Sequence, residues 1–203
     1  MVEDILKFDS DLFLYLNNLG TPYYDNLWMF LSRTEANVIV YLIILITYVN
    51  LIKNKKKTKI LLHLIIASAI LITISDQTSN LFKDSFQRLR PCYNELISDS
   101  LRLVKGSCGG RYGFFSAHAS NSFSLAIFFG LLLRSSNKLL IVLLTLYAFL
   151  ISYSRIYLGV HYPIDILVGA IFGTINAIIL YRLYLYSFNF LHKSWPTIIF
   201  FYF

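Results

Sequence analysis

Apolar residues fill five long stretches of the chain, and short polar segments separate them. The stretches cover about residues 27–52, 60–82, 114–133, 139–157 and 163–186. Each approaches or exceeds the roughly 20 residues that a helix needs to cross the hydrocarbon core of a bilayer. Several charge-free cores are shorter than this, so protein must shield some polar residues at the helix ends. The pattern predicts an all-α integral membrane bundle of about five transmembrane helices, in a single domain over residues 1–203.

The first 20 residues have a different pattern, in which apolar and polar side chains occupy opposite faces of a helix. The apolar face carries Ile5, Phe8, Leu12, Tyr15, Leu16 and Leu19. The polar face carries Asp4, Lys7, Asp11 and Asn18. Gly20 and Pro22 then end the pattern. We therefore expect an interfacial amphipathic helix over 1–20, before a transmembrane bundle over 27–186 and an aromatic tail over 187–203.

Composition supports a membrane protein, because 57% of the residues are hydrophobic and only 14% are charged. The formal net charge is +7. Five of the lysines fall in one short stretch between two apolar runs: Lys53, Lys55, Lys56, Lys57 and Lys59. Such a cluster is typical of a cytoplasmic loop under the positive-inside rule, and we expect no nucleic-acid partner.

The other basic residues between the apolar runs agree with this orientation. With five spans, Arg134, Lys138, Arg182 and Lys193 fall on the same side as the lysine cluster. This side is predicted to be cytoplasmic. The loop over 89–113 and the turn over 158–162 then face outward. We expect a multi-pass protein of the cell inner (plasma) membrane, with its polar motifs facing the periplasm or outside.

The first polar motif on that outer face is "KDSFQRLRP". Lys83 and Arg90 are seven residues apart, so in a helix they would share one face. Pro91 stops the helix. The pair could bind an anion, or it could be an anchor that extends its charges to the membrane interface.

The second motif is "FFSAHASNS", at the head of the third long apolar run. Ser116, Ala117 and His118 would occupy the first helical turn. Free backbone N–H groups and the positive end of the helix dipole favour a phosphate there. The alternatives are a structural histidine and small residues that allow close helix packing.

The third motif is "SRIYLGVHYPID", over residues 154–165. His161 precedes Pro163, which suits the first turn of a helix, and Asp165 lies four residues after the histidine. A carboxylate that binds one ring nitrogen leaves the other free to attack an electrophile. Arg155 ends the preceding apolar run. The alternative is an Arg155–Asp165 ion pair that only joins two helices.

In combination, these motifs resemble the type 2 phosphatidic acid phosphatase superfamily, membrane lipid phosphate phosphatases that share their core with vanadium haloperoxidases. Lys83, Arg90 and Pro91 match its first element. Its third element is matched in full by Ser154, Arg155, His161 and Asp165. The middle element is matched by Ser116 and His118, whereas Phe115 replaces a proline and Ala117 a glycine. The resemblance covers about residues 60–186.

The resemblance implies a metal-independent phosphatase with a phosphohistidine intermediate and no cofactor. His161 would attack phosphorus, Asp165 would orient it, and His118 would protonate the departing oxygen. The phosphate oxygens would be bound by Lys83, Arg90, Ser116, Ala117 and Arg155. No metal site is expected, because three cations and a helix terminus would replace the metal ion.

An outward-facing site in the headgroup layer favours a phosphorylated lipid as the substrate. Undecaprenyl diphosphate and lipid A are the leading candidates, followed by phosphatidylglycerol phosphate and phosphatidic acid. The alternatives are a lipid phosphotransferase that uses the same histidine and a non-catalytic membrane protein. The sequence does not indicate the oligomeric state.

The chain has two cysteines, Cys92 and Cys108, and both lie in the loop predicted to face outward. Thiols on that side are exposed to oxidising conditions, so we expect a disulfide. It would connect the end of the first motif with the approach to the second. The alternative is a pair of unbonded, buried cysteines.

Overall fold

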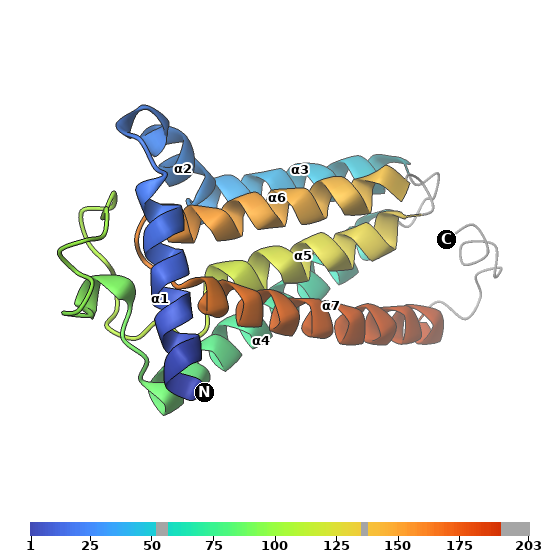
Figure 1. The fold of residues 1–203 in the computed structure, drawn as a ribbon. Coiled ribbons are helices and arrows are strands. Elements are labelled where there is room, and N and C mark those ends of the chain that lie inside the picture. The colour runs from blue at the N-terminus through green and yellow to red at the C-terminus, as the bar shows by residue number, and fades with distance from the viewer. Residues whose placement is uncertain (52–56, 135–137, 192–203) are drawn as a thin grey trace.

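Long helices lie lengthwise beside one another, and a further helix crosses one end of them (Figure 1). The computed structural model describes residues 1–51, 57–134 and 138–191. The lengthwise helices are α3 (Thr34–Leu51), α4 (Lys57–Phe86), α5 (Ala117–Leu133), α6 (Lys138–Tyr157) and α7 (Pro163–Leu191). The crossing helix is α1 (Val2–Asn18). The helical membrane bundle predicted from the apolar runs is therefore confirmed.

Helix α5 is the centre of the bundle, and it packs against α4, α6 and α7. Two glycines of α7 allow the closest of these approaches. A Cβ atom at Gly169 would lie 2.6 Å from the carbonyl oxygen of Ser116, and one at Gly173 would meet the carbonyl oxygen of Ser120. Real Cβ atoms essentially never come so close. The two helix backbones are thus held together at the end of the bundle where α5 begins.

By length and apolar composition, α4, α6 and α7 can each cross a membrane. Helix α5 is shorter, with 17 residues. It covers about 25 Å at 1.5 Å per residue. Three neighbouring helices surround α5, so most of its side chains contact protein. The helix therefore exposes little surface to lipid and can be shorter than a helix that faces the bilayer.

The run predicted as one span over 27–52 is broken. Helix α2 (Asp25–Leu31) and helix α3 form a bent pair with an angle of 55° between them. A side-chain amide of Asn37 donates to the carbonyl oxygens of Leu31 and Arg33, and so binds the backbone at the break. Ser32 at the break accepts a hydrogen bond from Arg155 of α6. The predicted span is therefore a pair of helices that together are long and apolar enough to cross a membrane, with contacts from Asn37 and Arg155 at the break between them.

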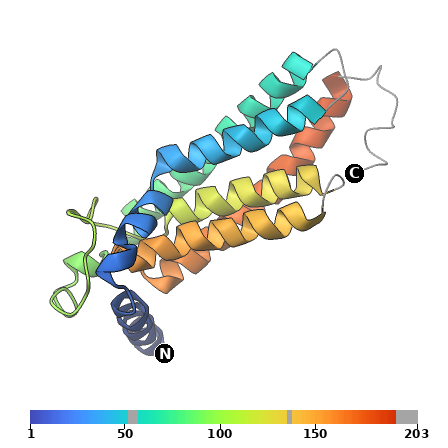
Figure 2. The same ribbon diagram turned by 90° about the horizontal axis from the view of Figure 1, so that it is seen from above.

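The amphipathic helix expected over 1–20 is present as α1, but a different face contacts the protein. The buried residues of α1 are Asp9, Phe13 and Asn17. Most of the predicted apolar face, including Ile5 and Phe8, stays exposed. Figure 2 shows α1 (dark blue) at the same end of the bundle as the loop between α4 and α5. An exposed apolar face on a helix that crosses the bundle end suits a position in the membrane interface.

Other boundaries differ by a few residues. A short 3₁₀ turn (Pro22–Tyr24) follows α1, and another (Pro91–Tyr93) lies in the loop after α4. Helix α7 continues to Leu191, so the first five residues of the predicted tail are helical. The rest of that tail, with Lys193, and the predicted cluster members Lys53, Lys55 and Lys56 lie outside the described residues.

Candidate active site

His161 and Asp165 lie side by side at the start of α7. Nδ1 of His161 is 3.3 Å from Oδ2 of Asp165, which also accepts the backbone N–H of Tyr162 at 3.0 Å. The side chains are almost fully buried, with 2% of His161 and none of Asp165 exposed. A carboxylate at Nδ1 favours a proton on that nitrogen and a lone pair on Nε2. In such a pair the second ring nitrogen has a lone pair that can attack an electrophile.

Three cations act on this imidazole. Burial lowers the pKa of His161 well below its usual range, and the charges of Arg90, Arg155 and Lys83 lower it further. The ring is therefore uncharged at neutral pH, which is the state that a nucleophile requires. The same positive charges suit an incoming phosphate, since they would neutralise its oxygens.

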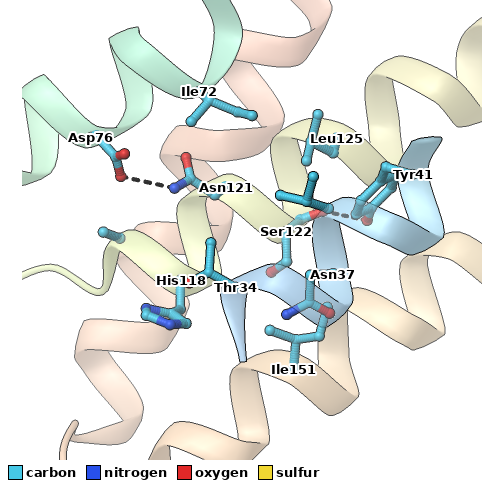
Figure 3. Close-up of a pocket in the computed structure, with 12 residues that line it drawn as sticks. Thr34, Asn37, Tyr41, Ile72, Asp76, His118, Asn121, Ser122, Leu125 and Ile151 are labelled. Atoms are coloured by element: carbon cyan, nitrogen blue, oxygen red, sulfur yellow. Dashed lines mark hydrogen bonds between the residues drawn. The ribbon is translucent and has the colours of Figure 1, made fainter. Parts of the chain in front are cut away.

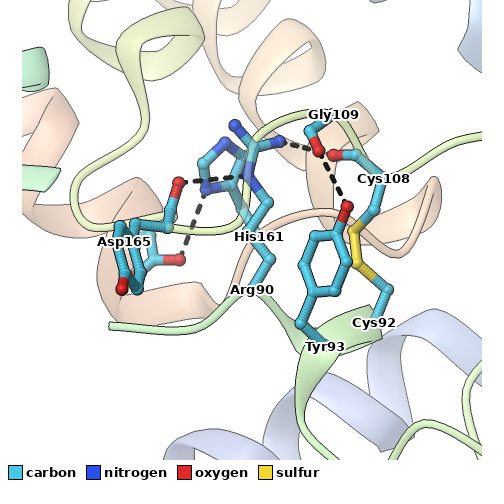
Figure 4. Close-up of a disulfide and its surroundings, with 8 residues drawn as sticks. Arg90, Cys92, Tyr93, Cys108, Gly109, His161 and Asp165 are labelled. Atoms are coloured by element: carbon cyan, nitrogen blue, oxygen red, sulfur yellow. Dashed lines mark hydrogen bonds and ion pairs between the residues drawn. A yellow bond between two sulfur atoms is a disulfide. The ribbon is translucent and has the colours of Figure 1, made fainter. Parts of the chain in front are cut away.

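Arg90 is held by the loop that precedes α5 (Figure 4). Its Nη1 donates to the carbonyl oxygen of Cys108 at 2.8 Å, and its Nε donates to that of Tyr112 at 3.2 Å. Cys92 and Cys108 form a disulfide, with Cα atoms 6.3 Å apart. The Tyr93 hydroxyl donates to the carbonyl oxygen of Gly109 at 3.0 Å. The cross-linked loop therefore fixes the direction of the Arg90 side chain.

Ser116 caps the N-terminus of α5. Its Oγ accepts the backbone N–H of Ala119 at 3.4 Å, and its own N–H donates to the carbonyl oxygen of Asp165 at 3.1 Å. The N–H groups of Ala117 and His118 belong to the first turn, where a helix offers no backbone acceptor. The start of α5 thus combines free donors and a positive dipole end beside the His161–Asp165 pair.

Ser32, at the break between α2 and α3, contacts two of the predicted site residues. Its hydroxyl accepts from Nη1 of Arg155, and its backbone forms a hydrogen bond with His118. Arg155 is only 4% exposed, and its Nε has no partner among the described residues. Arg155 therefore keeps a buried N–H donor that can still bind an anion.

The carboxylate of Asp165 pairs with an arginine of the first motif that was not among the predicted site residues. Nη1 of Arg88 is 2.8 Å from Oδ1 of Asp165. The alternative ion pair between Arg155 and Asp165 is absent from the part of the chain that the structure describes. Gln87, with φ of 47°, turns the chain after α4 and so directs Arg88 back toward α7. A second unpredicted residue is Gly113, whose missing side chain leaves room for Arg90, His161 and Asp165.

Lys83 lies in the last turn of α4, half-buried, and donates to Oδ1 of Asn80 at 3.3 Å. Its charge acts on His161. The structure thus brings all three predicted motifs to one end of the bundle. It places Lys83, Arg90 and Arg155 in the electrostatic neighbourhood of one histidine.

In a comparison with protein families, residues 57–189 match the model of the PAP2 superfamily. The chain belongs to the PAP2 superfamily. The matched segment begins with α4 and includes every predicted site residue, whereas α1, α2 and α3 lie outside it. The sequence-based prediction of a membrane lipid phosphatase is confirmed by this membership and by the curated relatives.

Three curated relatives are similar over most of the chain. A lipid A 4′-phosphatase of Bacteroides thetaiotaomicron is 40% identical over 176 residues, which are 85% of this chain and 75% of the relative. A lipid A 4′-phosphatase of Porphyromonas gingivalis is 35% identical over 187 residues, or 92% of this chain and 77% of the relative. An undecaprenyl-diphosphatase of Sulfolobus acidocaldarius is 30% identical over 172 residues, or 85% and 76%.

Two crystal structures share the fold. LpxE of Aquifex aeolicus superposes with a TM-score of 0.63 and 25% identity, over 85% of this chain and 93% of that one. A PAP2-type phosphatidylglycerolphosphate phosphatase of Bacillus subtilis gives a TM-score of 0.68 at 17% identity, over 89% and 86%. The second likeness concerns the fold alone.

A cavity of about 320 Å³ adjoins His118 in this PAP2 protein (Figure 3). It extends from the start of α5 into the bundle between α3, α4 and α6. Its lining is largely apolar, with Tyr41, Ile72, Leu125 and Ile151 among the contributors. One polar pair lies in it, since Nδ2 of Asn121 donates to Asp76 at 2.8 Å. Such a lining suits the non-phosphate part of a lipid.

Among the described residues, no three His, Cys, Asp or Glu side chains form a group that could hold a metal ion. His63 lies in the other half of α4, where it is 3.0 Å from the Ser187 hydroxyl and stacks on Phe188. The fourth histidine, His192, lies outside the described residues. The charged side chains that act on His161 are Lys83, Arg90 and Arg155, and its ring contacts the carboxylate of Asp165.

Proposed function

We propose that the chain hydrolyses a phosphate monoester of lipid A, at the 4′ position, on the outer face of the inner membrane. The observation that carries the proposal is the buried His161–Asp165 pair, which faces three cations at one end of a membrane bundle. The substrate is supported by two lipid A 4′-phosphatases that are 40% and 35% identical to the chain.

In the first step, the lone pair on Nε2 of His161 attacks phosphorus, and the bond from phosphorus to the lipid oxygen breaks. Asp165 accepts the hydrogen bond from Nδ1–H and stabilises the positive charge that grows on the ring. His118 gives its proton to the departing lipid oxygen. The products of this step are a phosphohistidine and the lipid alcohol.

In the second step, a water molecule attacks the phosphohistidine. His118, now without its proton, takes one from the water, and the bond from phosphorus to His161 breaks. Inorganic phosphate leaves, and both histidines return to their starting states. Lys83, Arg90, Arg155 and the first turn of α5, with Ser116 and Ala117, bind the phosphate oxygens as charge shifts among them. These groups supply the positive charge for both steps, so the proposed reaction needs no metal ion.

The position of the cavity agrees with the proposed role of His118 as the group that protonates the leaving lipid. It lies on the His118 side of the site, where the leaving lipid would be. Its apolar lining between α3 and α4 would accept hydrocarbon, while the phosphate stays at the polar end of the bundle. A soluble phosphate ester would leave this cavity unfilled.

The orientation in the membrane is supported by the charged ends of the helices. Figure 1 shows the start of α5 and the start of α6 at opposite ends of the bundle. Arg134 and Lys138 flank the connection from α5 to α6, at the end away from the site. Under the positive-inside rule this end is cytoplasmic, so the site faces outward.

Exposed cysteines test this orientation. Asp99→Cys and Lys138→Cys would be made separately in a background without Cys92 and Cys108. A membrane-impermeant thiol reagent on cells with a permeable outer envelope should label position 99 and leave position 138 unlabelled. The opposite labelling would reverse the orientation and move the substrate to the cytoplasmic leaflet.

A second candidate substrate is undecaprenyl diphosphate, because a relative with that activity is 30% identical to the chain. Purified protein in detergent would receive lipid A with a single phosphate at the 4′ position, lipid A with a single phosphate at the 1 position, undecaprenyl diphosphate, or phosphatidic acid. We expect the fastest release of phosphate from the 4′ form. A clear preference for undecaprenyl diphosphate would replace the proposed substrate.

His161→Gln tests the nucleophile in the same assay, with His63→Gln as a matched control in the far half of the bundle. We expect no turnover from His161→Gln, nearly normal turnover from the control, and inhibition by vanadate, which imitates five-coordinate phosphorus. A chelator should have no effect. Normal turnover by His161→Gln would exclude this residue as the nucleophile, and metal-dependent recovery after chelation would exclude the metal-free reaction.

A further inference from the structure

Helix α1 places a buried carboxylate next to the site, although it lies outside the segment that matches the PAP2 family. Asp9 is only 1% exposed. Its Oδ1 accepts the backbone N–H of Ile164 in the first turn of α7 at 2.9 Å, and its Oδ2 accepts from Nη2 of Arg88 at 2.6 Å. The rest of the helix is largely exposed, so this contact is a specific feature of one face.

Arg88 extends between two carboxylates. One arm of its guanidinium group binds Asp9, and the other binds Oδ1 of Asp165 at 2.8 Å. Oδ2 of Asp165 is then the oxygen that faces Nδ1 of His161 at 3.3 Å. An unbroken series of charged contacts therefore runs from α1 to the imidazole.

The neighbouring aromatic rings fix the plane of this series. The Arg88 guanidinium group lies over the ring of Tyr162, 4.1 Å from its centroid. Phe13 of α1 packs edge-on against the same ring, with 5.4 Å between centroids. The planar fork of an arginine presents its donors in a fixed geometry, so a guanidinium group held in this plane also fixes the carboxylate that it binds.

We propose that Asp9 is a positioning residue, which holds Arg88 across Asp165 and so fixes the direction of the His161 imidazole. The inference rests on the proposed roles of His161 and Asp165. Without the Asp9 carboxylate, one arm of Arg88 loses its charged partner, and the guanidinium group is free to turn away from Asp165. Asp165 then loses a fixed partner on Oδ1, and its other oxygen no longer has one defined position.

Asp9→Asn tests the proposal, because asparagine keeps the size of the side chain and an oxygen for the Ile164 N–H. Asp11→Asn is the matched control, since Asp11 is an exposed aspartate two residues away on the same helix. We expect kcat of Asp9→Asn to fall by about 10- to 100-fold, the loss that small misplacements of reacting groups produce. KM should change less than about twofold, because the phosphate-binding cations are untouched.

A second comparison tests whether Asp9 acts through Arg88. Arg88→Lys keeps the positive charge but cannot form the two-armed fork, so it should lose a similar factor in kcat. The double variant should be no slower than Arg88→Lys alone, because the two changes remove one and the same contact. Losses that multiply in the double variant would overturn the proposal, as would an equal kcat for Asp9→Asn and Asp11→Asn.

Folding and chemistry are separated by measuring the melting temperature and the amount of monodisperse protein for each variant. A loss confined to KM, or failure of both single variants to fold, would mean that Asp9 has a structural role only. His161→Gln is measured in parallel. If it retains turnover, the proposed function fails; if it is inactive while Asp9→Asn is normal, only the positioning role of Asp9 fails.

Discussion

Gly113 lies so close to the reacting groups that one added methyl group should disturb them. A Cβ atom at this position would be 3.0 Å from Cγ of Arg90, 3.3 Å from Oδ2 of Asp165 and 3.5 Å from Nδ1 of His161. Nonbonded carbon atoms prefer separations of about 3.5–4.0 Å. The backbone of Gly113 has little freedom to retreat, because its N–H donates to the carbonyl oxygen of Arg88 at 2.9 Å.

The magnitude follows from these distances. In Gly113→Ala, the Arg90 side chain must move by about 0.5 Å to restore an ordinary contact. Functional groups need to stay within about 0.5 Å of their productive positions, and a misplacement of 1 Å can cost about 100-fold in rate. We therefore expect kcat to fall by about tenfold. Stability should fall by about 1–3 kcal/mol, the usual cost of adding a methyl group to a packed site.

The assay is release of inorganic phosphate from 4′-phosphorylated lipid A, with kcat and KM measured separately and the melting temperature recorded. Gly110→Ala is the matched control, because no atom lies within 4 Å of a Cβ at that position in the same loop. The control should keep nearly all of its activity. An unchanged kcat in Gly113→Ala, or an equal loss in both variants, would refute the view that close packing over the histidine limits the rate.

Three further predictions follow from single features of the structure. Because burial and three cations lower the pKa of His161, the loss of kcat/KM on the acid side should begin only below pH 6.5, and an acid-side loss that begins at or above pH 6.5 would contradict this. Stability should also fall as the pH drops through that range, because the unfolded chain binds a proton that the folded ring does not. Cys92→Ser removes a disulfide between residues that are 16 apart in sequence, so the free energy of unfolding should fall by about 3 kcal/mol. KM should rise while turnover persists, and an unchanged melting temperature would contradict the prediction. In Gly173→Ala the new Cβ would lie 3.0 Å from the carbonyl carbon of Ser120, so the free energy of unfolding should fall by about 1–3 kcal/mol and the melting temperature should drop. Gly106→Ala is the control, because the space around that position is open, and it should melt like the unmodified protein.

The long apolar runs and the spacing of the motifs were sufficient to predict the bundle and the position of its polar end. The spacing of apolar residues indicates which side of a helix faces lipid or protein. The helices α5 and α7 also begin at or near polar residues that are typical of a first helical turn. The break after Leu31 could not be predicted in this way. Two kinds of contact lie at the break: Asn37 binds the local backbone, and Arg155, more than 120 residues later in the chain, donates to Ser32. The second contact has no signal in the local sequence.

The amphipathic pattern of the first helix predicted an interfacial helix, and the apolar residues Ile5 and Phe8 are exposed as such a helix requires. The pattern did not predict which residues of the helix contact the bundle. The buried face of α1, which packs against the rest of the protein, carries Asp9, Phe13 and Asn17. Asn17 donates from Nδ2 to the carbonyl oxygens of Ile156 and Tyr157 at 3.0 Å each, at the end of α6. A polar side chain that satisfies buried backbone groups looks the same in sequence as one that faces water.

The motifs identify the residues that are proposed to react, but they do not identify the residues that hold those side chains in place. Lys83, Arg90 and His161 are recognisable because their chemistry is rare inside an apolar chain, and a rare charge in a membrane segment indicates function. Arg88 has the same chemistry as Arg90, two residues away, and only the fold distinguishes the arginine that binds Asp165 from the one that the loop carbonyls aim at the histidine. A charged residue in an apolar chain can be recognised in the sequence as a candidate for a site of this kind. Its role depends on the residue that it contacts in the folded protein. The residues before α4 therefore belong to the active unit: they contribute the partner of Arg88 and, through Ser32, a partner of Arg155.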